Sequence, residues 1–377
     1  MRNLAPLVCF VLIGYLRADC SDLSYEECLY WAGYCEWNEE MEECQDIGGG
    51  DSEYGPYEYL SISQSDGMRD GPDYYHATLY YPIGAELPLK NIILGPGWGS
   101  SGSSISDWAH FFASYGFIAT TIDYNDPINE SHQDRAIAML DLIETVRQEN
   151  IRSDSPVFDQ IDTNKFAAVG YSLSGGVTQL VAMLDSTLDA AIALNPTIVI
   201  EDCQGCANYD YCICLLPEHL DHNVPTLIIS GENEIYELPD YEGLLGADQY
   251  FNTPENTSKM LYEISGGGHG SAAYPSSEFV QSKVLNWAKY HLMDSTDVCE
   301  NLIQEPEDAS QFLTTVDCIL LPSFDINDDG LIDSSDFIIL LDSVLNGYQL
   351  GISADFNFDS TVDIFDILIF SDYIGGI

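Results

Sequence analysis

The sequence predicts a mostly parallel α/β domain between a small cysteine-rich module and a C-terminal pair of helices. Short β-branched segments alternate with helically spaced apolar residues from Tyr75 to His291. A cluster of cysteines precedes this region, and a thirty-residue pattern occurs twice after it. The 377 residues exceed one typical domain, and 46% hydrophobic residues provide for a sizeable core. These patterns together predict three structural parts.

The first eighteen residues have the pattern of an export signal. Arg2 supplies positive charge, residues 7–16 form a short apolar run, and Ala18 offers a small residue for cleavage. A membrane anchor is the alternative, but the run is shorter than the roughly 18 apolar residues that span a bilayer. We expect residues 1–18 to be a signal peptide and the mature protein to be secreted and extracellular.

Ten of the 11 cysteines follow this signal, and an even number indicates disulfides in an exported protein. One group lies in an acidic, aromatic module at residues 20–47 that is too short for a core of its own. We expect two disulfides of undetermined connectivity among its four members, Cys20, Cys28, Cys35 and Cys44. Residues 48–53 then form a glycine-rich linker.

A second group of cysteines lies within the central region. Its members are Cys203, Cys206, Cys212 and Cys214, with His219 and His222 close behind. Paired disulfides are the favoured interpretation in an exported protein, and a zinc site is the alternative. Cys299 and Cys318 are then left as a further pair.

The charge balance excludes some classes of partner. The chain has 11 Lys and Arg against 62 Asp and Glu, a formal net charge of −51. Nucleic acids and anionic membranes carry charge of the same sign and would be repelled. We therefore expect no nucleic-acid partner and no anionic membrane partner. Clusters of Asp are also what calcium sites are made of.

The central domain, predicted for residues 54–303, alternates strands with helices. The strand-like segments are short, apolar and rich in β-branched residues: 91–94, 117–122, 166–169, 190–194, 226–229 and 262–264. Between two of them apolar residues recur at helical spacing, at Ala136, Met139, Leu140, Ile143 and Val146. This alternation predicts a sheet covered by helices on both faces, with reactive groups beyond the carboxyl ends of the strands.

A serine with small neighbours follows the strand at 166–169. The run GYSLSGG, residues 170–176, places Ser172 between this strand and the helical stretch 177–184. A strand-to-helix turn of this kind exposes a nucleophilic hydroxyl at a helix N-terminus. Ser174 occupies a place where glycine is usual, and its side chain is small enough to fit.

The other members of a hydrolytic triad follow in the order that α/β-hydrolases use: serine, acid, histidine. The strand at 226–229 leads into two carboxylates, Glu232 and Glu234, just past its end. His269 lies in a glycine-rich loop after the segment 262–264, where an imidazole can reach the nucleophile. Chain order therefore predicts Ser172, a carboxylate after the strand at 226–229, and His269 as the catalytic residues.

A glycine-rich turn after an early strand supplies the fourth element. Residues 95–99, GPGWG, stand where this fold places the second N–H donor of its oxyanion hole. We expect the backbone N–H groups of Trp98 and Leu173 to converge on an ester carbonyl oxygen. This chemistry needs no cofactor.

The central domain resembles the cutinase-like polyester hydrolases, the group that includes poly(ethylene terephthalate) hydrolases. The resemblance runs through residues 93–123, 156–176, 225–234 and 263–269, and it extends to Cys299 at the start of a C-terminal disulfide region. It implies Ser172 as nucleophile and His269 as general base. It also implies substrate contacts from four residues: Trp98, Tyr171, Thr197 and Tyr236.

Several positions depart from the pattern of that group. The resemblance implies Glu234 as the acid of the triad, where the group has Asp, and one extra methylene can still reach the histidine. Glu232 and Asp240 are rivals for this role. Trp98 replaces Tyr as the substrate platform, and Tyr171 replaces His or Trp beside the nucleophile. Thr197 replaces the Trp of an aromatic clamp, which removes a stacking surface of about 1 kcal/mol. The cysteine-rich insertion at 201–216 could rebuild this wall with its own tyrosines.

Two aspartate-rich loops repeat near the C-terminus. Oxygen ligands at loop positions 1, 3, 5, 9 and 12, with a backbone carbonyl at position 7, can wrap one calcium ion. The first loop supplies Asp325, Asn327, Asp329, Leu331, Asp333 and Asp336, and the second supplies Asp355, Asn357, Asp359, Thr361, Asp363 and Asp366. Each loop leads into an apolar helix, at 337–345 and at 367–374.

This duplicated pattern resembles a type I dockerin domain over residues 318–377. The resemblance implies an all-α domain that holds two Ca²⁺ ions, and it suggests a cohesin-type scaffold as partner. The residues that would meet such a partner differ between the two repeats, so the loops predict calcium more directly than they predict the scaffold.

The sequence thus predicts a secreted serine hydrolase of carboxylic esters, with polyesters as the favoured substrates. One alternative keeps the fold and changes the substrate to small esters, lipids or feruloyl-type esters of cell-wall material. An alternative of another class is a non-catalytic, calcium-dependent adhesion or scaffold-binding protein.

Overall fold

The computed structural model describes residues 35–38, 43–46, 55–197, 220–275, 277–318, 324–327, 331–347, 350, 354–357 and 361–375. Its contacts divide the chain into two units. The first contains residues 1–293 and 305–315, and the second contains residues 294–304 and 316–377. Each unit has a hydrophobic core of its own.

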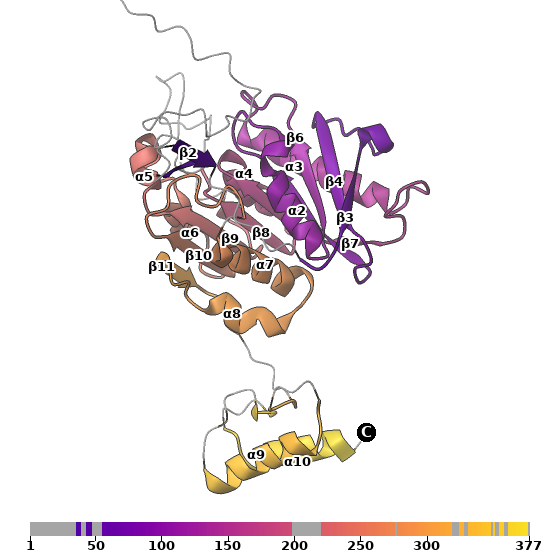
Figure 1. The fold of residues 1–377 in the computed structure, drawn as a ribbon, viewed down its shortest axis with the longest axis vertical. Coiled ribbons are helices and arrows are strands. Elements are labelled where there is room, and N and C mark those ends of the chain that lie inside the picture. Colours follow the sequence, from indigo (N-terminus) through magenta and orange to yellow (C-terminus); the bar gives the residue numbers. More distant parts are fainter. Residues whose placement is uncertain are drawn as a thin grey trace, which may run out of the picture. The chain divides into compact units, whose positions relative to one another are not determined.

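A nine-stranded mixed sheet forms the centre of the first unit (Figure 1). Its spatial order is β11-β10-β9-β8-β7-β5-β6-β4-β3. The strands are β3 Tyr59–Ser63, β4 His76–Pro82, β5 Leu89–Gly95, β6 Ile118–Asp123, β7 Ile161–Tyr171, β8 Ala190–Leu194, β9 Thr226–Gly231, β10 Lys259–Ile264 and β11 Ala309–Thr314.

The six middle strands run parallel, in the spatial order β10, β9, β8, β7, β5 and β6, and antiparallel strands close both edges. Parallel strands are buried on both faces, so they appear in the sequence as continuous apolar runs. Every residue of β8 and of β9 is buried. The sequence prediction of a mostly parallel α/β sheet is confirmed.

Helices cover both faces of this sheet. Those of the first unit are α2 Ser106–Ser114, α3 His132–Glu149, α4 Leu173–Leu184, α5 Glu234–Glu237, α6 Gly246–Asn252 and α7 Glu278–Leu292, with short 3₁₀ turns η2 Gln64–Asp66, η3 Gly102–Ile105 and η6 Pro239–Tyr241. Helices α3 and α4 pack together on one face, and α2 and α7 lie over the other (Figure 1).

Strands β3, β4 and β11, which lie at or next to an edge of the sheet, were not predicted from apolar runs in the sequence. Strand β4 largely alternates buried and partly exposed residues, β3 buries Ile62 alone, and β11 has no buried residue. Strand β11 also lies beyond residue 303, where the sequence prediction ends this domain. An edge strand buries one side only, so its composition is less apolar than that of a central strand.

The second unit contains two apolar helices, α9 Ser334–Asn346 and α10 Ile364–Gly375, together with η7 Thr296–Val298 and α8 Cys299–Ile303. Its core gathers Leu340, Phe356, Ile367 and Phe370, and the ring of Phe324 stacks on Phe356 at 4.4 Å between centroids. The two predicted C-terminal helices are thus present. Cys299 and Cys318 form a disulfide within this unit.

Several predicted features lie outside the described residues. These are residues 1–18, the linker, six cysteines at positions 20, 28, 203, 206, 212 and 214, and the loop positions Asp329 and Asp359. The backbone of β1 Cys35–Asn38 and β2 Glu43–Asp46 forms an antiparallel pair. Within the described part of the chain, no helix is long and apolar enough to cross a membrane.

Candidate active site

A sharp turn between β7 and α4 presents Ser172. This residue has φ 55° and ψ −118°, a left-handed backbone that serine rarely adopts. A Cβ at Gly170 would lie 2.0 Å from the carbonyl oxygen of Ser174, so only glycine fits before the turn. The glycine before the turn thus allows helix α4 to pack closely against strand β7. Ser172 projects beyond the carboxyl end of this central strand.

Three side chains from three separate strand ends meet at this turn. Ser172 Oγ lies 2.8 Å from His269 Nε2, and His269 Nδ1 lies 2.8 Å from Glu234 Oε1. A carboxylate can only accept a hydrogen bond, so Nδ1 carries the proton and Nε2 is free to accept the proton of the hydroxyl. The structure therefore brings together Ser172, Glu234 and His269. The Ser172 hydroxyl can donate its proton to His269 Nε2, and His269 Nδ1 donates to Glu234, as acyl transfer requires.

The two rival carboxylates do not bond to the imidazole. Glu232 Oε2 accepts the Gly266 N–H at 2.8 Å, which holds the start of the glycine-rich loop. Asp240 lies in η6, beyond the short helix that carries Glu234. Sequence reasoning missed Glu237, whose Oε2 accepts the backbone N–H of His269 at 2.6 Å. Carboxylates of one segment thus hold both the ring and the backbone of the histidine loop.

Burial gives Glu234 an unusual environment. Its side chain is 1% exposed, and desolvation raises the pKa of the carboxyl above its ordinary value. Hydrogen bonds from His269 and Asn195 act in the opposite direction and favour the charged form. The carboxylate is therefore a strong acceptor for the Nδ1 proton of His269.

The loop after β5 lies against the serine turn. A Cβ at Gly97 would approach Tyr171 Cδ1 at 3.2 Å and Ser172 Cβ at 3.4 Å, so the loop backbone passes directly beside Ser172. Leu173 begins α4, and the N–H of a first helical residue has no partner in its own helix. This geometry is suited to an oxyanion hole built from the N–H groups after Gly97 and Ser172.

Ser174, which replaces the usual glycine, connects the turn to that loop. It is fully buried, its Oγ donates to the carbonyl of Pro96, and it lies 2.9 Å from the hydroxyl of Tyr124. The spacing of the motif gave no sign of these bonds, because Pro96 and Tyr124 come from two other strand ends. The extra hydroxyl thus ties three loops together.

Comparison with known protein families identifies the family of this chain. The model of the PET hydrolase-like family matches residues 54–317, which is more than half of the chain. The chain belongs to the PET hydrolase-like family. This family, which includes cutinases, consists of carboxylic ester hydrolases.

Individual relatives are distant. Cutinase est2 of Thermobifida alba is 29% identical over 218 residues, which cover 57% of this chain and 63% of the relative. Cutinase 2 of Thermobifida cellulosilytica is 26% identical over 263 residues, 67% of this chain and 87% of the relative. A bis(hydroxyethyl) terephthalate hydrolase of Streptomyces coelicolor is 26% identical over 251 residues, 64% of this chain and 69% of the relative.

Aromatic side chains flank the site in this family member. Trp98 is 62% exposed and Tyr236 is 81% exposed. Tyr171 donates its hydroxyl to the carbonyl of His269 at 3.0 Å, with the two rings 5.6 Å apart. Thr197, by contrast, is buried, and its N–H bonds to the carbonyl of Ser172 at 3.0 Å. Two exposed rings thus lie beside the oxyanion loop and beside the acid.

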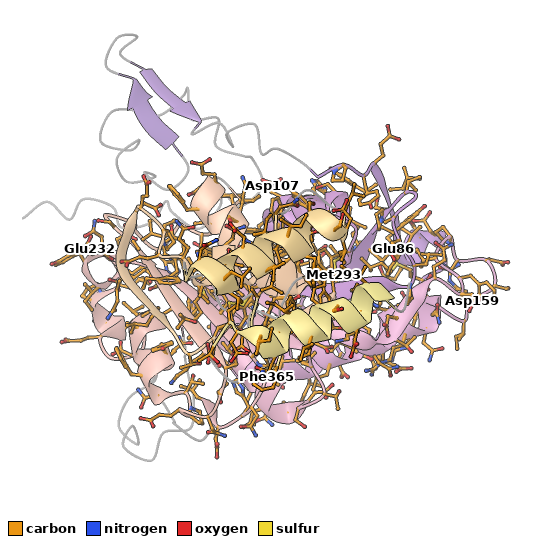
Figure 2. The ribbon with its side chains drawn as sticks, turned by 90° about the horizontal axis from the view of Figure 1, so that it is seen from below. Glu86, Asp107, Asp159, Glu232, Met293 and Phe365 are labelled. Atoms are coloured by element: carbon orange, nitrogen blue, oxygen red, sulfur yellow. A yellow bond between two sulfur atoms is a disulfide. The ribbon has the colours of Figure 1, made fainter. Side chains whose placement is uncertain are left out.

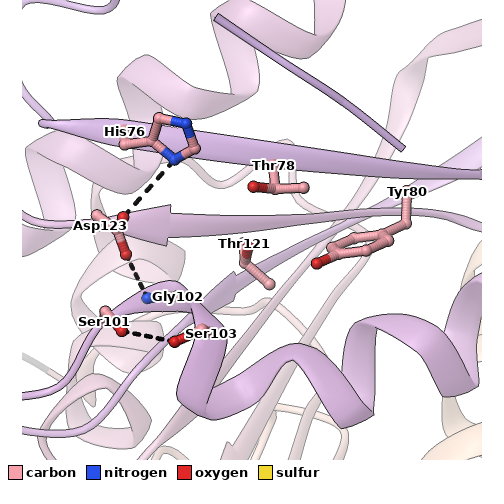
Figure 3. Close-up of a pocket in the computed structure, with 8 residues that line it drawn as sticks. All are labelled: His76, Thr78, Tyr80, Ser101, Gly102, Ser103, Thr121 and Asp123. Carbon is pink, nitrogen blue, oxygen red and sulfur yellow. Dashed lines mark hydrogen bonds and ion pairs between the residues drawn. The ribbon is translucent and has the colours of Figure 1, made fainter. Parts of the chain in front are cut away.

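A polar hollow of about 180 Å³ lies elsewhere on the first unit (Figure 3). Its lining comes from β4, β6 and η3: His76, Thr78, Tyr80, Ser101, Gly102, Ser103, Thr121 and Asp123. His76 Nδ1 faces Asp123 Oδ2 at 3.6 Å, and the other oxygen of Asp123 accepts the Gly102 N–H. None of the residues predicted for catalysis lines it.

Each suggested metal site includes residues outside the described part of the chain. Among the described residues, no three His, Cys, Asp or Glu side chains come close enough to hold a metal ion. His222, named in the zinc alternative, is buried and lies 2.8 Å from Gln179 Oε1, and burial lowers its pKa to about 4. The rest of that cysteine group lies outside the described residues.

The two C-terminal loops nevertheless share one internal pattern. The carboxylates of Asp336 and Asp366 are fully buried, at position 12 of each loop. Each accepts backbone N–H groups from positions 2, 3 and 9 of its loop: Ile326, Asn327 and Asp333 in the first, Phe356, Asn357 and Asp363 in the second. The repeat seen in the sequence is therefore also a repeat in structure.

Proposed function

We propose that this PET hydrolase-like protein is a secreted serine esterase that cleaves polyesters through an acyl-enzyme. The observation that carries the proposal is the continuous chain of hydrogen bonds from Ser172 through His269 to Glu234, at a strained strand-to-helix turn. The cutinases and the terephthalate-ester hydrolase among its relatives support the substrate class.

The mechanism follows from these positions. Ser172 Oγ attacks the ester carbonyl carbon while His269 Nε2 takes the hydroxyl proton, and Glu234 holds the imidazolium that forms. The N–H groups of Trp98 and Leu173 receive the oxyanion, each contributing about 10²–10³ in rate. His269 then protonates the leaving alkoxide as the carbonyl reforms. A water molecule, deprotonated by the same nitrogen, attacks the carbonyl carbon of the acyl-enzyme. His269 returns this proton to Ser172 Oγ as the bond between Oγ and the acyl group breaks, and the carboxylic acid leaves.

The exposed rings favour a polymer over a small ester. Trp98 adjoins the oxyanion loop and Tyr236 follows the acid within α5, so both rings extend the site outward rather than enclosing it. Flat aromatic surfaces of this kind can lie against a polyester segment.

The acidic side chains Glu86, Asp159 and Glu232 of the same unit are exposed, and Figure 2 shows them projecting from the ribbon. An uncharged substrate avoids repulsion by such a surface.

The C-terminal unit contributes calcium binding in this proposal. Asp and Asn side chains, with backbone carbonyls at position 7, form the hard oxygen set that Ca²⁺ prefers. Asp325, Asn327 and Asp333 would bind one ion together with the other first-loop ligands, and the second loop would bind another. A cohesin-type scaffold remains the partner that the loop-helix repeat suggests. Calcium has no role in the ester chemistry.

Substrate choice is tested by comparing p-nitrophenyl esters, from acetate to laurate, with an amorphous polyester film. We expect turnover of both, with Trp98→Ala and Tyr236→Ala lowering film hydrolysis by about 3- to 10-fold more than ester hydrolysis, because each ring contributes about 1 kcal/mol of contact to an extended substrate. Phe251→Ala serves as control, since that ring is 64% exposed on α6 and outside the site.

Soluble-ester turnover without any film hydrolysis would instead favour a small-ester or feruloyl-type esterase. Equal losses on both substrates would show that the rings do not serve a polymer. A folded parent protein that hydrolyses neither substrate would favour the non-catalytic adhesion protein.

The Glu234→Gln variant is expected to lose activity without losing stability. The raised pKa of Glu234 means that the native state binds more protons than the unfolded state between the two pKa values. Stability contributed by this group therefore falls as pH rises through that interval, and the buried charge is unfavourable above it. We expect the variant to lose about 10⁴-fold in kcat, while its Tm at pH 8 is no lower than that of the parent. A lower Tm would contradict the stated effect of burial.

A further inference from the structure

Asn195 is a buried amide with an unusual backbone beside the candidate acid. It follows β8, is fully buried and has φ 43°, a conformation that asparagine tolerates better than most residues. Its N–H donates to the carbonyl of Ile229 at 2.7 Å, which fixes it to β9. Neither the spacing of the hydrolase motifs nor the chain order drew attention to this residue.

The orientation of this amide is determined by its neighbours. Asn195 Oδ1 accepts the backbone N–H of Ala272 at 2.7 Å, and a backbone N–H can only donate. Nδ2 must therefore face the other way, where it donates to Glu234 Oε1 at 2.8 Å and to Ser271 Oγ at 3.1 Å. The side chain thus links the loop that follows His269 to the carboxylate that holds the imidazole.

We propose that Asn195 is a positioning residue that holds the Glu234 carboxylate in line with His269 Nδ1. The same oxygen, Oε1, receives both Asn195 Nδ2 and His269 Nδ1, each at 2.8 Å. Two donors converging on one oxygen restrict the rotation of a long glutamate side chain more than the imidazole alone does. This inference rests on the proposed serine-esterase function.

Electrostatics gives the positioning role a distinct signature. His269 is the titratable group that faces the Glu234 carboxyl from the glycine-rich loop, while Glu232 and Glu237 of its own segment bind backbone N–H groups of that loop. The Gly231 backbone faces it from β9 and Asn195 faces it from β8. The hydrogen bond from Asn195 lowers the pKa of the Glu234 carboxyl, so loss of this donor raises that pKa further.

Two variants test the proposal on p-nitrophenyl butyrate. Asn195→Ala removes the donor, and we expect kcat to fall by about 10- to 100-fold, as for the loss of a hydrogen bond to a charged group. KM is expected to stay within about threefold of the parent value, because the amide touches no substrate. The acidic limb of the kcat/KM profile is expected to move to higher pH.

Asn195→Asp is a second variant that tests the same role if Asn195→Ala fails to fold. It keeps the size, the tolerance of a positive φ and the acceptor for the Ala272 N–H, but it turns a carboxyl towards Glu234. Like charges facing each other disfavour ionisation of both groups. We expect about 10- to 100-fold lower kcat at pH 8, with partial recovery at lower pH as the new carboxyl becomes protonated and can donate.

Gln249→Ala is the matched control. Its amide is also fully buried and supports the loop after β8, which contains Asn195, through a hydrogen bond from Nε2 to the carbonyl of Pro196 at 3.1 Å. It does not bond to Glu234. We expect its pH profile to match the parent profile. If Gln249→Ala and Asn195→Ala lose the same activity with unshifted profiles, Asn195 is only structural. Turnover by the parent combined with unchanged kcat in both Asn195 variants overturns the inference alone, whereas an inactive parent overturns the proposed function.

Discussion

Ser172→Ala is expected to lower kcat for p-nitrophenyl ester hydrolysis by about 10⁴- to 10⁶-fold. The reason is geometric: Ser172 Oγ, the proposed nucleophile, lies 2.8 Å from His269 Nε2, and no other group in that contact can form the acyl-enzyme. Binding should persist, because the aromatic rings and the loop after Gly97 are unchanged. The measurement is steady-state turnover, together with mass spectrometry of the parent after reaction with a p-nitrophenyl phosphonate, which should label Ser172 stoichiometrically.

His269→Ala should lose about as much as Ser172→Ala, and the double variant little more, because the two residues act as a unit. Ser103→Ala is the control, since this serine lines the separate hollow of Figure 3 and should leave turnover unchanged. Substantial turnover by a purified, folded Ser172→Ala protein would reject Ser172 as nucleophile. Loss of activity in Ser103→Ala would instead assign the hollow a part in the reaction.

Removal of calcium is expected to unfold the C-terminal unit while leaving soluble-ester turnover unchanged. The core of this unit is small, and its loops carry Asp side chains that repel one another without a cation. Ligand binding to the native state alone contributes about 2.7 kcal/mol per site at a calcium concentration 100 times Kd. The catalytic unit has its own nine-stranded sheet and core, so it should not depend on the ion.

The measurements are isothermal titration calorimetry of calcium into chelator-treated protein and far-ultraviolet circular dichroism of the apo and loaded forms. We expect two ions per chain and a gain of helical signal on loading. Asp366→Ala should remove one ion, whereas Asp342→Asn should remove none, because Asp342 is exposed on α9 outside both loops. No binding, or an unchanged spectrum after chelation, would contradict the calcium proposal.

The predicted and observed elements differ in a systematic way. Strands β5, β6, β7, β8 and β9 were predicted from short apolar runs because both of their faces are buried. Strands β3, β4 and β11 lack that signal because they lie at or next to an edge of the sheet. Helix α3 was indicated by apolar spacing over residues 136–146, whereas the four-residue α5 is too short for any periodicity.

The sequence alone was sufficient to propose Ser172 and His269, because local backbone demands reveal them. A strained turn requires glycine at Gly170, and a histidine in a glycine-rich loop after a strand is recognisable without its neighbours. The C-terminal repeat is likewise local, since each loop bonds within itself.

Only the tertiary structure decided which carboxylate faces the imidazole. Glu232, Glu234 and Glu237 lie within six residues of one another and have the same chemistry, yet only Glu234 bonds to the ring while the others bond to the loop backbone. The amide of Asn195 was equally hidden, because its partners stand 39 and 77 residues away in the chain. Such contacts depend on how separate strand ends meet across the sheet, and no local pattern of residues encodes that distance.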